Sequence, residues 1–149
     1  MKLKIGDKAP DFELPSTGGG TFRLSDNLSD GNLVLYFYPK DFTPGCTAEA
    51  CGFRDEFTLL GELNLRVVGV STDTIESHES FRREHRLPFE LLSDTGGRVA
   101  KLFGVYNGLF NIANRVTFVI DREGKILSVT KNMFSPKTHV GAAKAAGRR

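Results

Sequence analysis

Residues 36–51 read YFYPKDFTPGCTAEAC, and this stretch contains both cysteines of the chain. It continues an apolar run that begins after Asn32, passes through a proline-containing turn, and then takes up a helical pattern at Cys46. A continuous apolar run is typical of a strand that is buried on both faces of a sheet. The stretch therefore predicts a buried strand that delivers a cysteine to the first turn of a helix.

The segments around this stretch predict a mixed sheet covered by helices. Strands are expected at 12–14, 21–24, 32–38, 65–71, 89–92, 116–121 and 126–131. Helices are expected at 46–62, 74–86 and 95–103, with a weak last helix capped by Ser135 and Pro136. Strand–helix–strand units require parallel pairing, whereas the late hairpin must be antiparallel. This order predicts an α/β, thioredoxin-like fold with an N-terminal β-hairpin extension, and a flavodoxin-like sheet is the alternative.

Length and composition limit the classes of protein to consider. The 149 residues suit a single domain spanning 1–149, and the net charge of +2 comes from interspersed acids and bases. Nucleic-acid binding, which needs clustered basic residues, is therefore not expected. The start of the chain has no apolar signal core, and no apolar run approaches a membrane span, so we expect no membrane partner and a cytoplasmic location. In that reducing compartment, two cysteines favour catalytic or redox use.

The residues before Cys46 predict a reactive thiol. Thr43 is a candidate N-cap whose hydroxyl can accept a hydrogen bond from the first helical turn, and Pro44 suits the first helical position. Gly45 would let a substrate approach the backbone closely. Cys46 then occupies the third helical position, where the helix dipole favours the thiolate. The alternative is an inert, buried cysteine.

Cys51 lies five residues further along the same predicted helix. Five helical residues rise about 7.5 Å, which puts the two Cα atoms roughly 8.6 Å apart. A disulfide needs Cα atoms within about 7 Å, so the pair cannot bridge while the helix is intact. If Cys51 reacts with Cys46, the first helical turns must unwind. The alternative is that Cys51 packs inertly beside Phe53 and Phe57.

A metal site is not expected. The two cysteines supply only half of the four ligands that a structural zinc requires. His78 and His85 lie in the charged run HESFRREHR and are expected to face solvent, and His139 is isolated in the sequence. A Cys–His hydrolase would need a histidine that approaches Cys46 only in space. We therefore expect no metal or other cofactor.

The quoted stretch, extended to YFYPKDFTPGCTAEACGFRD at 36–55, resembles the active-site segment of the peroxiredoxins. Its C-x4-C spacing resembles the bacterioferritin-comigratory, or Q-type, thiol peroxidases. Other segments resemble the family in order and spacing, namely GDKAPDFELPS, VVGVSTD, LLSD and NRVTFVIDREGKI. The similarity covers roughly residues 3–131 and implies the thioredoxin-like fold.

The resemblance also implies roles for individual residues. Cys46 matches the peroxidatic cysteine and Cys51 the resolving cysteine. Thr43 matches the threonine that contacts the peroxide, Pro39 the proline that shields the thiolate, and Arg115 the arginine that stabilises it. In a thioredoxin-like sheet, the strand that Arg115 opens would run antiparallel to the strand ending at Tyr38 and so begin beside Cys46. Glu49 could orient Arg115.

The function implied by the resemblance is the reduction of hydrogen peroxide and organic hydroperoxides. Cys46 would become a sulfenic acid, Cys51 would form a disulfide with it, and thioredoxin or a similar dithiol would reduce that disulfide. No cofactor is implied, and a monomer is expected. The alternatives are a thiol–disulfide oxidoreductase, although that class normally carries C-x-x-C, and a non-enzymatic redox sensor.

Overall fold

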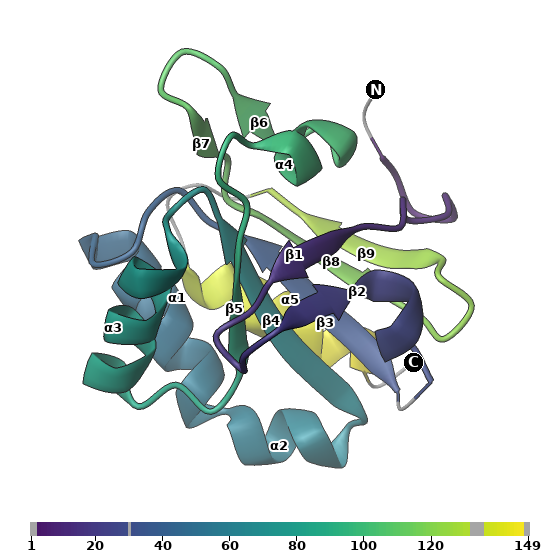
Figure 1. Ribbon diagram of the computed structural model, residues 1–149. Helices are drawn as coiled ribbons and strands as arrows, with labels where there is room; N and C mark the ends of the chain where they lie inside the picture. The colour runs from purple at the N-terminus through teal and green to yellow at the C-terminus, as the bar shows by residue number, and fades with distance from the viewer. Residues whose placement is uncertain (1–2, 30, 132–135, 148–149) are drawn as a thin grey trace.

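A five-stranded mixed sheet forms the centre of the computed structural model, which describes residues 3–29, 31–131 and 136–147 (Figure 1). Its strands in spatial order are β5 (Glu90–Ser93), β4 (Leu65–Ser71), β3 (Asn32–Phe37), β8 (Val116–Ile120) and β9 (Ile126–Thr130). β3, β4 and β5 are parallel, whereas β8 pairs antiparallel with both β3 and β9. This arrangement confirms the predicted α/β, thioredoxin-like sheet.

Side chains of β3 alternate between two separate hydrophobic cores. Leu33, Leu35 and Phe37 face one core, and Val34 and Tyr36 face the other. Because successive side chains of a strand point to opposite faces, a fully apolar run such as this one needs cover on both sides. The apolar run that the sequence offered as a buried strand is therefore the central strand of the sheet.

Most of the helices cover one face of the sheet, whereas the N-terminal segments and one short helix cover the other (Figure 1). The helices on the first face are α1 (Pro44–Asp55), α2 (Phe57–Glu62), α3 (Ile75–His85) and α5 (Pro136–Gly147). The opposite face is covered by β1 (Glu13–Pro15), β2 (Thr21–Arg23), the 3-10 helix η1 (Leu24–Asn27) and α4 (Arg98–Leu102). β1 and β2 form the predicted N-terminal hairpin.

Several boundaries differ from the sequence prediction. The helix expected at 46–62 begins two residues earlier, at Pro44. It is also divided into two helices at Glu56, which has φ −97° and ψ 7°. The helix expected at 95–103 starts only at Arg98, since Gly96 and Gly97 have positive φ. A short hairpin of β6 (Tyr106–Asn107) and β7 (Ile112–Ala113) was not predicted.

The last helix packs through small residues. Val140, the one large apolar residue that the sequence offered there, is buried together with Ala143 and Ala146. Pro136 opens the helix, while Ser135, its predicted cap, lies outside the described residues. Within the described part of the chain, no helix combines the length and apolar character that crossing a membrane would require.

Candidate active site

The thiol of Cys46 lies at the N-terminal end of α1, directly after the turn that follows β3. Cys46 is the third residue of α1 and is only 1% exposed. Arg115, the residue before β8, donates a hydrogen bond from Nη2 to its Sγ over 3.2 Å. The β3–β8 register, with Phe37 opposite Val116, explains this contact because it brings the start of β8 beside the end of β3. A fixed cation and a helix start therefore meet at one sulfur.

Glu49 holds the guanidinium of Arg115 from the other side. Arg115 Nη1 donates to Glu49 Oε1 over 2.5 Å, and the Glu49 side chain is completely buried. Burial raises the pKa of Glu49 to about 7, although the charge of Arg115 and its hydrogen bond act in the opposite direction. Burial lowers the pKa of Arg115, but Glu49 and Cys46 outweigh it and raise that pKa overall. Arg115 therefore stays charged while it serves two acidic groups.

α5 contributes a third group to this cluster. His139 Nδ1 lies 3.6 Å from Glu49 Oε2 and 2.7 Å from the hydroxyl of Thr117 on β8. His139 is fully buried. No pattern in the sequence indicates this placement, because His139 stands among small and polar residues and its nearest titratable neighbours are Lys137 and Lys144. The C-terminal helix is thus joined to the residue that orients Arg115.

Gly45 has a neighbour that the sequence did not indicate, and the predicted approach of a substrate there stays a prediction. A Cβ built on Gly45 would lie 3.0 Å from Arg115 Nη2, which is closer than about nine in ten Cβ contacts in real structures. The glycine therefore makes room for the guanidinium beside the helix start, whereas the sequence interpretation assigned that space to a substrate.

Thr43 is the N-cap of α1, as predicted, but its hydroxyl is used differently. The hydroxyl does not accept a hydrogen bond from the first helical turn; it donates one to the carbonyl of Lys40 over 2.8 Å. The predicted cap bond is therefore wrong, and the lone pairs of Oγ1 remain able to accept. Pro39 is half-buried in the bend between β3 and α1.

A buried network fixes the turn between β3 and Cys46. Asp41 accepts hydrogen bonds from the Tyr38 hydroxyl over 2.6 Å and from the Ser77 hydroxyl over 2.8 Å, and lies 2.7 Å from His78 Nδ1. The other ring nitrogen of His78 is 2.8 Å from the carbonyl of Leu92. The prediction that His78 faces solvent is wrong, because His78 lies fully buried on the same side of α3 as Phe81.

The same network brings together atoms of a kind that bind cations. Ligand atoms of Asp41, Asp73 and His78 lie within 4.8 Å of one another. Asp73 Oδ2, however, already accepts from the backbone N–H of Asp41 over 2.8 Å and from the hydroxyl of Ser71 over 2.6 Å. The carboxylate oxygens of Asp41 and Asp73 thus already have hydrogen-bond partners within the protein. These hydrogen bonds hold the loop before Cys46 in position.

Cys51 and Cys46 are both unbridged thiols on an unbroken part of α1. Cys51 is half-buried and faces α3, where its Sγ lies 3.9 Å from Nδ1 of His85. Neither the interpretation of Cys51 as an inert neighbour of Phe53 and Phe57 nor that of His85 as a solvated residue anticipated this pair. The signal in the sequence was weak, since 34 positions separate them.

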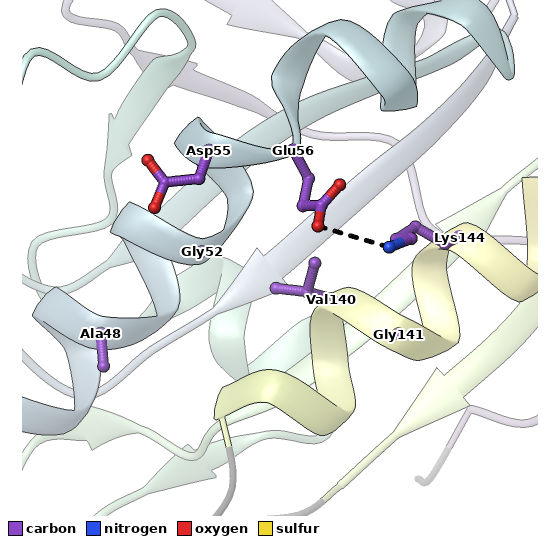
Figure 2. Close-up of a pocket in the computed structure, with 7 residues that line it drawn as sticks. All are labelled: Ala48, Gly52, Asp55, Glu56, Val140, Gly141 and Lys144. Atoms are coloured by element: carbon purple, nitrogen blue, oxygen red, sulfur yellow. Dashed lines mark ion pairs between the residues drawn. The ribbon is translucent and has the colours of Figure 1, made fainter.

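A pocket of about 320 Å³ opens between α1 and α5 (Figure 2). It is lined by Ala48, Gly52, Asp55, Glu56, Val140, Gly141 and Lys144. Cys46 is not among these residues, so the pocket is separate from the reactive thiol. An ion pair of 3.4 Å between Glu56 and Lys144 spans it, and Val140 points toward Gly52 (Figure 2).

Comparisons with known proteins agree with this geometry. The model of the AhpC/TSA family matches residues 5–129. Peroxiredoxin Bcp of Bacillus subtilis is 43% identical over 149 residues, covering 96% of this chain and 94% of that protein. The chloroplastic peroxiredoxin Q of Triticum aestivum is 41% identical, covering 94% of this chain and 64% of that protein. The crystal structure of peroxidoxin BcpB from Mycobacterium tuberculosis is similar with a TM-score of 0.93 and 45% identity, covering 98% of this chain and 97% of that one.

Proposed function

The chain belongs to the AhpC/TSA family and is a peroxiredoxin, a thiol peroxidase, and from this premise we propose how its own residues reduce a hydroperoxide. The observation that carries the proposal is the 3.2 Å contact between Arg115 Nη2 and Cys46 Sγ at the start of α1. A thiolate at this place is stabilised by a fixed cation and by the unpaired N–H groups of the first helical turn.

In the first step, the Cys46 thiolate attacks one oxygen of the peroxide. The oxygen–oxygen bond breaks, Cys46 becomes a sulfenic acid, and the departing oxygen leaves as hydroxide or alkoxide, which takes up a proton to give water or an alcohol. Arg115 stabilises the negative charge that develops on the departing oxygen. Because Glu49 fixes the guanidinium in advance, the stabilisation needs no reorganisation of the site.

Thr43 and Pro39 are assigned supporting roles in this step. Since the Thr43 hydroxyl already donates to the carbonyl of Lys40, it would accept a hydrogen bond from the protonated oxygen of the bound peroxide. The peroxide would thereby be aligned for attack along its oxygen–oxygen bond. Pro39, half-buried beside the helix start, would limit the access of water to the thiolate.

In the second step, Cys51 attacks the sulfenic sulfur of Cys46. A disulfide forms and water leaves, and the first turns of α1 must unwind because the helix otherwise holds the Cα atoms too far apart. A thioredoxin-like dithiol then reduces the disulfide by exchange and restores both thiols.

One assay separates this function from its alternatives. Hydrogen peroxide consumption is coupled to thioredoxin, thioredoxin reductase and NADPH, with insulin reduction measured in parallel. We expect sustained peroxide turnover and little insulin reduction. A disulfide oxidoreductase would reverse the two results, and a redox sensor would oxidise once without turnover.

Two cysteine variants complete the test. Cys46→Ser should abolish peroxide consumption, and retained turnover would remove Cys46 from the proposed role. Cys51→Ser should still form the sulfenic acid, trapped with dimedone, but should form no internal disulfide. An internal disulfide detected in Cys51→Ser by mass spectrometry would refute the pairing, because the chain has no third cysteine.

We also propose that the protein acts as a monomer in a reducing, cytoplasmic compartment. The residues of the proposed site all come from one chain. Within that chain Arg115 contacts Cys46 and Glu49, and Cys51 contacts His85. Sedimentation of the reduced protein should give the mass of one chain. A dimeric mass would overturn the proposal.

A further inference from the structure

The side chain of Cys51 faces the last turn of α3. Its Sγ lies 3.9 Å from Nδ1 of His85, a long but feasible distance for a hydrogen bond that involves sulfur. His85 is the last residue of α3, and both side chains are half-buried. A thiol that must later act as a nucleophile is thus already beside a group that can accept its proton.

Two aromatic rings and two residues of α1 surround His85. The rings of Phe81 and Phe42 lie against the imidazole, with centroids at 5.1 and 6.5 Å. From α1, the titratable or charged groups that contact His85 are Cys51 and Arg54, and Arg54 reaches only the backbone carbonyl. Cys51 is thus the group from α1 that lies beside the ring itself.

The half of α1 that carries Cys51 is anchored on both sides. Arg54 Nη1 donates to the carbonyl of His85 over 2.7 Å, which ties α1 to α3. On the other side, a Cβ at Gly52 would lie 3.2 Å from Val140 Cγ2, and Glu56 pairs with Lys144 (Figure 2). Phe53, between these anchors, is completely buried.

The half that carries Cys46 is held chiefly through Arg115, which bonds to the buried side chains of Cys46 and Glu49. Pro44 is exposed and Gly45 and Thr47 are half-buried, while Phe42, in the preceding loop, is 48% exposed and has a positive φ of 67°. Unwinding that starts from this end must release Cys46 from Arg115, but it leaves the contacts of Arg54 and Gly52 in the other half intact. Cys46 can move to Cys51, whereas Cys51 stays beside His85.

We propose that His85 is a catalytic residue of the resolving step, acting as the general base for Cys51; this inference rests on the proposed function. Nδ1 of the neutral ring takes the Sγ proton of Cys51, and the resulting thiolate attacks Sγ of the Cys46 sulfenic acid. The new sulfur–sulfur bond replaces the sulfur–oxygen bond, so that Cys51 is oxidised and the sulfenic sulfur is reduced. The hydroxide that leaves takes the proton from His85 and becomes water.

The test measures the two chemical steps separately in single turnover. Reduced protein is mixed with one equivalent of hydrogen peroxide and quenched with acid at timed intervals, and sulfenic acid and disulfide are counted by mass spectrometry. In His85→Ala we expect formation of the disulfide to slow by about 100-fold, the lower end of the range for general-base catalysis. Oxidation of Cys46 should keep its wild-type rate, because His85 does not touch that sulfur.

Exogenous imidazole distinguishes a general base from a residue that only supports the structure, because free imidazole can replace the lost base but cannot restore lost packing. Added imidazole should restore disulfide formation in His85→Ala and leave the wild-type rate unchanged. Glu84→Gln, an exposed neighbour on α3, is the matched control and should behave as wild type in both steps. His85→Gln, which keeps more of the side-chain volume, should be slow as well and covers the case in which the alanine variant folds poorly.

Two results would overturn the inference. One is a wild-type rate of disulfide formation in both His85 variants, and the other is a slow rate that imidazole does not restore in a folded His85→Ala. A failure of the proposed function would look different, since the wild-type protein itself would then form no sulfenic acid or no disulfide.

Discussion

In the proposed mechanism the chemistry at Cys46 depends on Arg115, whose guanidinium contacts an acidic group on each side. Nη2 reaches Cys46 and Nη1 reaches Glu49. A planar group with several donors can serve both at once, whereas an ammonium is a point charge on a flexible stem. The positive charge alone therefore does not explain how one side chain contacts both Cys46 and Glu49, since this also requires the planar shape of the guanidinium.

Replacing Arg115 tests charge and shape separately. Arg115→Met should slow the oxidation of Cys46 by about 100-fold or more, the usual loss when a transition-state donor is removed. Arg115→Lys should fall between this variant and wild type, and in Arg115→Met alkylation of Cys46 by iodoacetamide should need a higher pH. Single-turnover oxidation and alkylation against pH measure these effects. Arg122→Met, exposed in the β8–β9 turn, is the control, and an unchanged rate in Arg115→Met would remove Arg115 from the site.

Gly45 allows stability and activity to be separated. Gly45→Ala should slow Cys46 oxidation by roughly 10-fold or more, because its Cβ would displace Nη2 of Arg115, and small misplacements in an active site are costly. The melting temperature should hold or rise, since alanine favours a helix over glycine by up to about 1 kcal/mol. The control is Gly61→Ala in α2, where a Cβ meets nothing within 4 Å. Equal rates in both variants would contradict the prediction.

At the scale of elements, the proposed cycle requires the first half of α1 to unwind while the second half stays in place. Oxidation to the disulfide should raise the hydrogen-exchange rates of amides at 46–50, while amides at 52–55 keep their protection. Exchange of the reduced and oxidised proteins followed by mass spectrometry measures this difference. In Cys51→Ser the sulfenic form should keep α1 protected throughout. Loss of protection as far as residue 55 in the oxidised wild type would show that both halves move.

The elements differ in how well the sequence predicted them. The strand expected at 65–71 has those bounds, because an apolar run between turn residues leaves little choice. The interruption at Glu56 was missed, since helical spacing continues from Phe53 to Leu60 across it. His78 was wrongly placed in solvent because its neighbours are charged. Its spacing of three from Phe81, on one side of α3, was the signal that could have placed it in the core.

At the scale of the whole molecule, the sequence predicted a mixed, thioredoxin-like sheet, but it did not predict the contacts between the helices that cover it. The thioredoxin-like fold predicted that β8 begins beside the end of β3, and the register of these two strands confirms it. No local pattern indicated that α5 would bring His139 to Glu49 or that α3 would bring His85 to Cys51. Such pairs depend on how helices pack on one face, which the periodicity of each helix alone does not determine.

Glu49 links three distant parts of the chain, and its burial makes stability depend on pH. Its pKa rises from an ordinary 4.5 to about 7 in the folded protein, chiefly through burial and against the effect of Arg115. Between these two pH values the folded state holds a proton that the unfolded state has released. The free energy of unfolding therefore falls as pH rises from 4.5 to 7, by on the order of 3 kcal/mol at roughly 1.4 kcal/mol per unit.

Glu49→Gln removes this titration while it keeps the side-chain shape. The variant should be less sensitive to pH, so that its free energy of unfolding, relative to wild type, increases by on the order of 3 kcal/mol from pH 4.5 to pH 7. Urea unfolding at a series of pH values measures the difference. Glu123→Gln, exposed in the β8–β9 turn, is the control and should follow the wild-type curve. Parallel curves for Glu49→Gln and wild type would mean that Glu49 is already ionised throughout this range, held so by Arg115 despite its burial.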